Sequence, residues 1–175
     1  RPHASKSILY ECFALFVTTP HGPRRAGVFA VADCTEPGVH ATRLDDPELP
    51  DDEPLVLGGR SMGGRMCSLI AAGADGEPPP PNLRGLVLIS YPLHPPGKPD
   101  QLRVEHLPAI RVPTLFVSGT KDTFGTPDEI TRWSATMPKQ AKVQHLWIEG
   151  KGHDLKGADH TIAGAVKDLL ERVAG

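Results

Sequence analysis

The sequence predicts one α/β domain, in which helices cover both faces of a mostly parallel sheet. Two observations along the chain support this fold class. From residue 54 onward, short apolar runs alternate with connections long enough to hold a helix, and a glycine-rich turn joins the first run to a helical segment. The chain then closes on an amphipathic stretch. Strands connected in this way pair in parallel and are buried under helices on both sides.

The composition is that of an ordinary globular domain, and it excludes several function classes. A net charge of −2 gives no electrostatic attraction for nucleic acid or for an anionic membrane surface. Aromatic residues, at 5%, are too few for a base-stacking platform. Every apolar run is far shorter than the roughly 18 residues that span a bilayer. We therefore expect no nucleic-acid partner and no membrane association.

The three cysteines are Cys12, Cys34 and Cys67, and none belongs to a Cys-x-x-Cys pair. Their odd number and wide spacing argue against a disulfide framework or a zinc site and favour a reducing compartment. No charged start leads into an apolar signal core. We expect a cytoplasmic protein that uses neither a metal nor another cofactor.

The N-terminal part, residues 1–53, differs from the rest of the single domain. Two strand-like runs in residues 11–33 flank the turn Pro-His-Gly-Pro, which predicts an antiparallel hairpin. Residues 34–53 contain prolines and acids with little periodicity, and only the stretch 39–44 suggests a short strand. The expected organisation is a hairpin plus an irregular segment, followed by a catalytic core in residues 54–175.

Four apolar runs predict the parallel strands, at residues 54–58, 84–90, 113–119 and 142–150. Four consecutive prolines lie between the first two runs and can enter neither a helix nor a central strand, so we expect a surface loop there. The segment 91–112 is also rich in proline and is expected to be mostly irregular.

Three segments have helical periodicity. The first follows Ser61 and ends at Gly73. The second, residues 126–137, begins with Thr126 as the cap and a proline at the first helical position, and Glu129 completes a capping box. The third places five apolar side chains on one face of a closing helix: Ile162, Val166, Leu169, Leu170 and Val173.

The turn before the first helix reads Gly59-Arg60-Ser61-Met62-Gly63. A strand, Gly-x-Ser-x-Gly and a helix in this order form a nucleophile elbow, in which a strained turn projects the serine hydroxyl. Glycines are needed because larger side chains would collide with the adjoining strand and helix. The following helix directs its N-terminal amides toward developing negative charge.

Other interpretations of the glycines fit less well. A phosphate-binding loop needs a lysine after its second glycine, whereas Arg65 follows Gly64 here. A dinucleotide-binding fingerprint needs Gly-x-Gly, which this turn lacks. The remaining alternative is a glycine-rich turn without chemistry.

A serine hydroxyl becomes a good nucleophile only when a base removes its proton and a third group orients that base. In this architecture an acid and then a histidine follow the serine, each just after a strand. Asp122 follows the third predicted strand, and His153 follows the fourth. Asp128 fits the first turn of its helix better, and Asp154 fits the surface. The sequence therefore predicts a triad of Ser61, Asp122 and His153.

Four other residues are predicted around this site. Met62, directly after the nucleophile, would donate its backbone N–H to an oxyanion. Arg60 flanks the elbow and would attract an acidic substrate, although a solvated or ion-paired arginine is the alternative. Tyr91 and His94, in the loop after the second strand, are predicted to border the mouth of the pocket and contact substrate.

With these features the chain resembles the α/β-hydrolase superfamily over roughly residues 54–175. Four motifs, GGRSMGGRM, LISYPLHPPGKP, PTLFVSGTKDTFG and GKGHDL, resemble a small branch related to dienelactone hydrolases. That branch includes testis-expressed and chromatin-complex hydrolase-like proteins. The resemblance implies a compact, lidless fold with the triad Ser61, Asp122 and His153. Dienelactone hydrolases proper use a cysteine where this chain has Ser61.

The region before the elbow departs from the family's pattern. Such proteins carry there a strand ending in a His-Gly-type loop, a helix, another strand and another helix, and the loop supplies a second oxyanion N–H. Here His21-Gly22 fits a hairpin turn better, and only about twenty loop-like residues follow the hairpin. The fold is expected to be short by one or two strand–helix units. A sheet lacking a strand exposes an edge, which a homodimer would cover.

The sequence thus predicts a serine hydrolase that cleaves a small carboxylic ester, thioester or lactone through an acyl-enzyme. Its expected partner is a small ester-like molecule. A non-catalytic hydrolase-like scaffold that binds proteins is the main alternative, and the resemblance to the chromatin-complex branch permits it. An acyltransferase using the same acyl-enzyme is a third possibility.

Overall fold

The computed structural model describes residues 54–173 and the backbone of five short strands closer to the N-terminus. These strands are β1 (Ala14–Leu15), β2 (Val17–Thr19), β3 (Gly22–Arg24), β4 (Val31–Asp33) and β5 (His40–Thr42). In the part described, no helix is long and apolar enough to cross a membrane.

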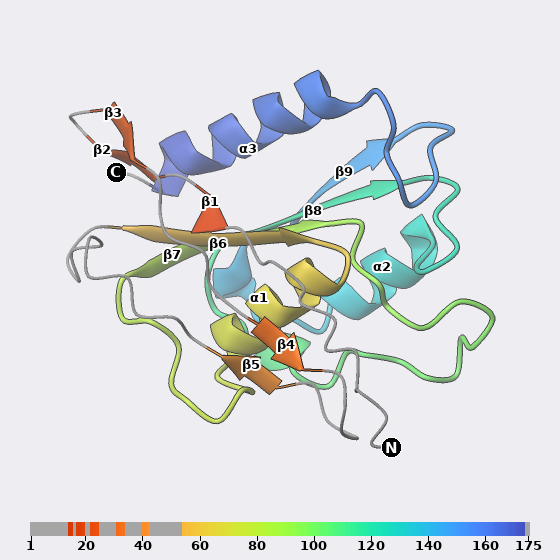
Figure 1. Cartoon of the computed structure of the whole chain (residues 1–175), viewed down its shortest axis with the longest axis horizontal. Helices are drawn as coiled ribbons and strands as arrows, with labels where there is room; N and C mark the ends of the chain where they lie inside the picture. Colours follow the sequence, from red (N-terminus) through yellow and green to blue (C-terminus); the bar gives the residue numbers. More distant parts are fainter. Residues whose placement is uncertain are drawn as a thin grey trace, which may run out of the picture.

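The main sheet has five strands in the order β1-β6-β7-β8-β9 (Figure 1). Its four parallel members are β6 (Leu55–Arg60), β7 (Leu83–Ile89), β8 (Thr114–Gly119) and β9 (Gln144–Ile148). Strand β1 adds to the edge of β6 in the antiparallel direction. The predicted mostly parallel sheet is confirmed, and the C-terminal ends of its four parallel strands lie at one edge.

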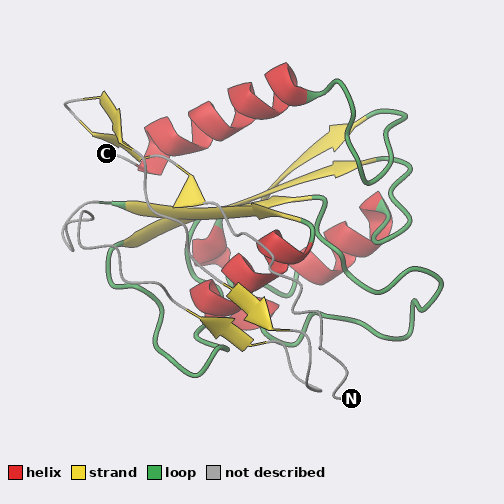
Figure 2. Ribbon diagram, in the orientation of Figure 1, coloured by secondary structure: helices red, strands yellow, loops and turns green. Residues whose placement is uncertain are grey.

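Helices cover both faces of this sheet, as Figure 2 shows. On one face lie α1 (Met62–Ala72) and α2 (Pro127–Ser134), and on the other lies α3 (Asp159–Val173). Two short 3-10 helices, η1 (Leu107–Ala109) and η2 (Lys139–Ala141), interrupt the connections. The proline-rich segment between β7 and η1 is irregular, as predicted.

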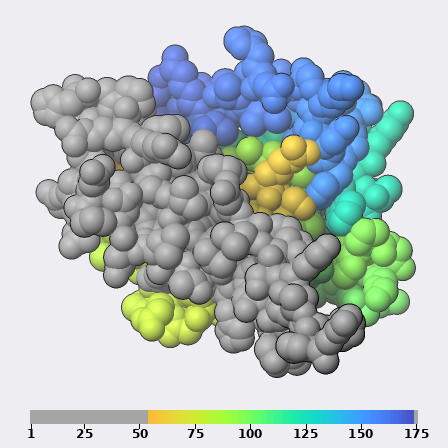
Figure 3. Space-filling model, in the orientation of Figure 1, coloured from red at the N-terminus to blue at the C-terminus, as the bar shows by residue number. Residues whose placement is uncertain are grey.

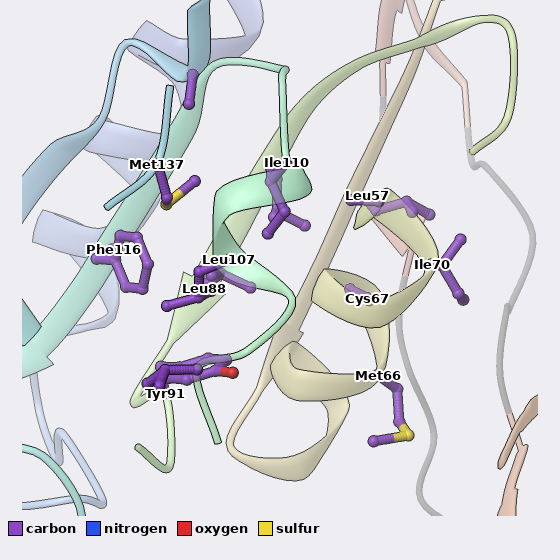
Figure 4. Packing of buried hydrophobic residues seen from close by; sticks show 14 of the residues in the cluster. Leu57, Met66, Cys67, Ile70, Leu88, Tyr91, Leu107, Ile110, Phe116 and Met137 are labelled. Carbon is purple, nitrogen blue, oxygen red and sulfur yellow. The ribbon is translucent and has the colours of Figure 1, made fainter. Parts of the chain in front are cut away.

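Alternation along the strands divides the core into two layers. On β6, Leu57 packs on the α1 side of the sheet, while Val56 packs on the α3 side. The same division separates Leu88 from Val87 on β7. Since successive side chains of a strand point to opposite faces, runs that are apolar throughout belong in a sheet buried on both sides. Figure 4 shows the larger layer, in which the side chains of α1 pack against those of β7, β8 and η1.

The end of α1 and the start of α2 were predicted from local chemistry that the structure contains, whereas the helix expected over 126–137 ends earlier, at Ser134. Gly73 caps α1 in the left-handed conformation, with φ 68°, and its N–H donates to Ile70 O. At the start of α2, Thr126 accepts from the Glu129 N–H while the Glu129 carboxylate accepts from the Thr126 N–H. The predicted capping box is therefore confirmed.

The hairpin predicted around the Pro-His-Gly-Pro turn is present but shorter than expected. Strand β2 pairs antiparallel with β3, with Thr19 opposite Gly22 and Val17 opposite Arg24. The later part of the predicted second strand, β4, pairs instead with β5, which lies inside the stretch 39–44. Pro23 has no N–H to donate, which limits the ladder between β2 and β3. The rest of residues 1–53 lies outside the described part of the chain.

His106, just before η1, is a buried group that makes stability depend on pH. Its Nε2 lies 2.7 Å from Ser68 Oγ. Burial, with a smaller contribution from the positive charge of Arg65, lowers its pKa from 6.5 to about 4, although Glu105 opposes the shift. Between these two values the unfolded chain binds a proton that the folded protein does not. The free energy of unfolding should therefore fall as the pH drops from about 6.5 to about 4.

We expect this loss of stability to be about 3 kcal/mol, since each pKa unit corresponds to about 1.4 kcal/mol. Urea unfolding at several pH values measures it. In His106→Gln the extra slope between pH 4 and 6.5 should disappear, while the other acid-sensitive groups continue to act as in the wild type. Equal slopes in the two proteins would contradict the assignment.

Candidate active site

The nucleophile elbow lies at the C-terminal end of β6. Ser61 has φ 52° and ψ −124°, and its backbone N–H donates to Ile89 O at 2.8 Å. A serine before a helix usually caps it through its side chain, but Ser61 makes no such bond to α1. The strained turn therefore leaves the hydroxyl available for another partner.

The glycines of the turn are required by a close approach between β6 and α1. A Cβ on Gly59 would lie 2.6 Å from Gly64 N, and a Cβ on Gly64 would lie 2.7 Å from Gly59 O. Both atoms belong to the backbone and cannot rotate away. Because Gly59 and Gly64 lack a Cβ, the first turn of α1 can pack directly against the end of β6.

We expect Gly59→Ala to destabilise the protein by about 3 kcal/mol or more, because the new methyl group forces β6 and α1 apart. Chemical denaturation monitored by circular dichroism measures the change. Gly164→Ala in α3 is the matched control, since a Cβ there meets nothing within 4 Å. That control should be neutral or slightly stabilising, and a Gly59→Ala protein of wild-type stability would contradict the close approach.

The structure brings the three predicted triad side chains together. His153 Nε2 lies 2.8 Å from Ser61 Oγ. On the other side of the ring, His153 Nδ1 lies 2.9 Å from Asp122 Oδ2 and 3.1 Å from Oδ1. Asp122 is 1% exposed and also accepts the Phe124 N–H at 2.9 Å. A buried carboxylate held in this way orients an imidazole whose second nitrogen faces the hydroxyl.

Two loops at the C-terminal edge of the sheet carry the acid and the histidine. The Lys121 N–H donates to Lys151 O at 2.8 Å, and the Gly150 N–H donates to Thr120 Oγ1 at 2.8 Å. A Cβ on Gly119 would lie 2.6 Å from the Lys151 carbonyl carbon, so the loops touch through their backbones. This contact sets the spacing of Asp122 and His153.

The imidazole is also held from one of its faces. The Phe124 ring stacks on the His153 ring, with centroids 4.1 Å apart and planes inclined by 28°. Such a contact limits rotation of the imidazole away from the serine. In Figure 3 the gold surface of the elbow segment lies beside the blue surface that follows β9, so this part of the site reaches the outside of the molecule.

The predicted oxyanion residue, Met62, is the first residue of α1. The first N–H groups of a helix have no partner within the helix, and they point toward charge at its N-terminus. The Arg103 guanidinium lies 3.5 Å from Met62 Sδ. The upstream region, in which the family supplies a second oxyanion donor, lies outside the residues described in full.

The structure places Tyr91 and His94, the predicted substrate contacts, in buried positions. Tyr91 is 0% exposed, its hydroxyl donates to Arg103 O at 2.8 Å, and burial raises its pKa to about 12. Figure 4 shows it among the buried side chains of the core. His94 is 5% exposed, with Nδ1 2.9 Å from Pro95 O. The loop after β7 turns back into the core instead of forming a rim.

Arg60 is exposed and interacts with the protein itself. Its Nη2 donates to the carbonyl oxygen of His153 at 3.1 Å. Its side chain also borders a groove of about 410 Å³ along α3, whose floor is largely apolar and includes Ile89 and Val166. Arg60 is thus linked to the loop that carries the histidine, which is an alternative to the predicted attraction of an acidic substrate.

Sequence reasoning missed two residues that contact His153. Phe124 stacks on its ring, and the Ser90 hydroxyl donates to its carbonyl oxygen. Phe124 lies shortly after the predicted strand 113–119, and Ser90 is the last residue of the predicted strand 84–90, so a position at a strand end was the available signal. Among the described residues, no group of three or more His, Cys, Asp or Glu side chains is arranged to hold a metal ion.

This elbow and sheet define an α/β-hydrolase fold. A family model for an alpha/beta hydrolase domain matches residues 34–174. The chain therefore belongs to the alpha/beta hydrolase family.

Solved structures with this fold include enzymes from several microorganisms. The esterase domain of a Rhodothermus marinus protein has a TM-score of 0.54 at 13% identity, covering 69% of this chain and 62% of that one. A Paleococcus ferrophilus monoacylglycerol lipase has a TM-score of 0.54 at 15% identity, covering 68% and 69%. A thermophilic esterase from Thermogutta terrifontis has a TM-score of 0.53 at 20% identity, covering 70% and 66%. At these identities the likeness shows the fold alone.

Proposed function

We propose that this protein is a serine hydrolase that cleaves a small carboxylic ester, thioester or lactone. The observation that carries the proposal is the continuous line of short contacts from Asp122 through His153 to Ser61. A buried carboxylate that orients a histidine toward a serine hydroxyl is the arrangement that activates a serine as a nucleophile. Together these groups can make the hydroxyl nucleophilic.

The proposed reaction has two halves. Ser61 Oγ attacks the carbonyl carbon while His153 Nε2 takes the hydroxyl proton, and Asp122 keeps the other ring proton on Nδ1. The tetrahedral oxyanion collapses, the C–O or C–S bond breaks, and His153 protonates the leaving group. His153 then activates a water that attacks the acyl-enzyme, and it returns the proton to Ser61 as the acid is released. The Met62 N–H stabilises the oxyanion in both halves.

The substrate class rests on the form of the site and on the resemblance to the dienelactone-hydrolase-related branch. The segment between β7 and β8 packs into the core through Tyr91, Leu93 and Leu107, so it does not form a large lid. A site on which this described segment forms no lid suits a small substrate more than a long-chain lipid. Because a serine stands where dienelactone hydrolases have a cysteine, an open-chain ester is as suitable a substrate as a lactone. We propose a cytoplasmic setting for such a small-molecule enzyme.

A non-catalytic hydrolase-like scaffold that binds protein partners is the second candidate, and the resemblance to the chromatin-complex branch permits it. The chain spans 62% of the length of the Rhodothermus marinus esterase domain. If a second oxyanion donor is lacking, the rate falls on the order of 10²–10³-fold, since each donor contributes that much. A scaffold would keep the fold and would bind protein partners or a second copy of itself.

A fluorophosphonate probe tests the proposed function. The folded protein should be labelled covalently, and tandem mass spectrometry should place the adduct on Ser61. Heat-denatured protein is the control and should remain unlabelled. Absence of labelling in a folded sample would favour the scaffold. Turnover of p-nitrophenyl acetate, butyrate and octanoate, with and without an alcohol acceptor, would then define the acyl chain and separate hydrolysis from acyl transfer.

A further inference from the structure

The carbonyl oxygen of His153 receives two hydrogen bonds from outside its own loop. Ser90 Oγ donates to it at 2.8 Å, and Arg60 Nη2 donates to it at 3.1 Å. Ser90 is 0% exposed, whereas Arg60 is exposed. Water competes for the bond from the exposed guanidinium, so the buried hydroxyl is the stronger constraint on this carbonyl.

Ser90 has a backbone conformation that favours glycine, which suggests that its side chain has a function. Its φ is 50°, in the left-handed region where glycine is the least strained residue. Its N–H donates to Val117 O at 2.7 Å, which holds that conformation at the end of β7. A glycine would fit this backbone more easily but would provide no hydroxyl. Strain retained at such a position points to a role for the side chain.

The end of β7 contacts two members of the triad at once. Ile89 O accepts the backbone N–H of Ser61 at 2.8 Å, and the next residue, Ser90, donates to the carbonyl of His153 at 2.8 Å. The nucleophile and the base are therefore both attached to one dipeptide of a central strand.

We propose that Ser90 is a positioning residue that fixes the backbone of His153 and thereby keeps the imidazole within reach of the Ser61 hydroxyl. The inference rests on the proposed hydrolase function. Ser90 takes no part in bond making or breaking. Its hydroxyl holds the carbonyl, the carbonyl fixes the main chain at residue 153, and the main chain directs the imidazole.

Two substitutions separate the hydroxyl from the backbone strain. Ser90→Ala removes the hydroxyl and keeps a Cβ in the left-handed conformation. Ser90→Gly removes the hydroxyl and relieves the strain. Ser118→Ala is the matched control, because Ser118 is a fully buried serine on β8 whose hydroxyl has no hydrogen-bond partner among the described residues.

We expect both Ser90 variants to lower kcat for p-nitrophenyl acetate about tenfold, the effect of losing one buried hydrogen bond that aligns the base. KM should stay within about twofold, since the variants leave ground-state binding intact. Fluorophosphonate inactivation should slow by a similar factor. The thermal midpoint of Ser90→Gly should be at least that of Ser90→Ala, so activity and stability should not change in parallel. Ser118→Ala should keep the wild-type kcat.

Hydrogen exchange of the peptide covering residues 150–156 gives a readout that does not depend on turnover. It should be faster in both Ser90 variants and unchanged in Ser118→Ala. A wild-type kcat in Ser90→Gly, or the same exchange rate in all variants, would overturn the positioning role. If the wild-type protein shows neither labelling nor turnover, the proposed function fails, and the exchange experiment still decides whether Ser90 holds the loop.

Discussion

Ser61→Ala is expected to lower kcat for ester hydrolysis by at least about 10⁴-fold, because triad members act as a unit and removal of the nucleophile eliminates the acyl-enzyme route. In the folded protein Ser61 Oγ has His153 Nε2 at 2.8 Å as its partner. Alanine keeps the Cβ in the same turn, so the loss concerns chemistry more than folding. Steady-state hydrolysis of p-nitrophenyl acetate measures the change.

Fluorophosphonate labelling and thermal unfolding distinguish the loss of the nucleophile from a loss of folding. The Ser61→Ala protein should not react with a fluorophosphonate, whereas Ser118→Ala should react at the wild-type rate. The thermal midpoint of Ser61→Ala should remain close to that of the wild type, because the Ser61 hydroxyl does not cap α1. Hydrolysis that persists in Ser61→Ala at more than a few per cent of the wild-type rate would identify a different nucleophile.

Asp122→Asn should have a comparable effect, a fall in kcat/KM of about 10⁴-fold at neutral pH. The carboxylate accepts the Nδ1 proton of His153 at 2.9 Å. An asparagine amide group can donate there instead, which favours the tautomer with its proton on Nε2. That nitrogen then cannot accept the proton of Ser61. The asparagine oxygen can still accept the Phe124 N–H, so the loop should keep its conformation.

Asp154→Asn is the matched control, since Asp154 is exposed and its carboxylate contacts the Lys156 N–H within its own loop. It should leave kcat/KM within about twofold of the wild type. Proton NMR of the imidazole should show the changed tautomer in Asp122→Asn alone. If the two variants have equal activity, Asp122 does not orient the base.

The positions of the triad residues could be predicted because each is tied to a local pattern. Glycines crowd around Ser61 between a strand and a helix, and Asp122 and His153 each follow a buried apolar run. Parallel strands place their C-terminal ends at one edge, so residues that follow different strands meet there. The sequence therefore placed the three residues at one edge of the sheet, and the strand order of the structure brings their side chains into contact.

The same reasoning did not predict the burial of Tyr91 and His94, which also follow a strand. Whether a loop residue turns outward or inward depends on what the loop packs against. Tyr91 meets Phe116 of β8 edge to face, and its hydroxyl donates to Arg103 O, 12 residues further along the same connection. No periodicity of the segment itself contains that information.

By itself the sequence determined the kinds of element, their order, the helix caps and the location of the elbow, because apolar periodicity, capping residues and glycine sterics act over a few residues. The tertiary structure alone decided which side chains hold the site in place. Ser90 and His153 are 63 residues apart, and their hydrogen bond exists only because the end of β7 meets the loop that follows β9. Contacts of this kind depend on the packing of the whole sheet, which a local pattern does not specify.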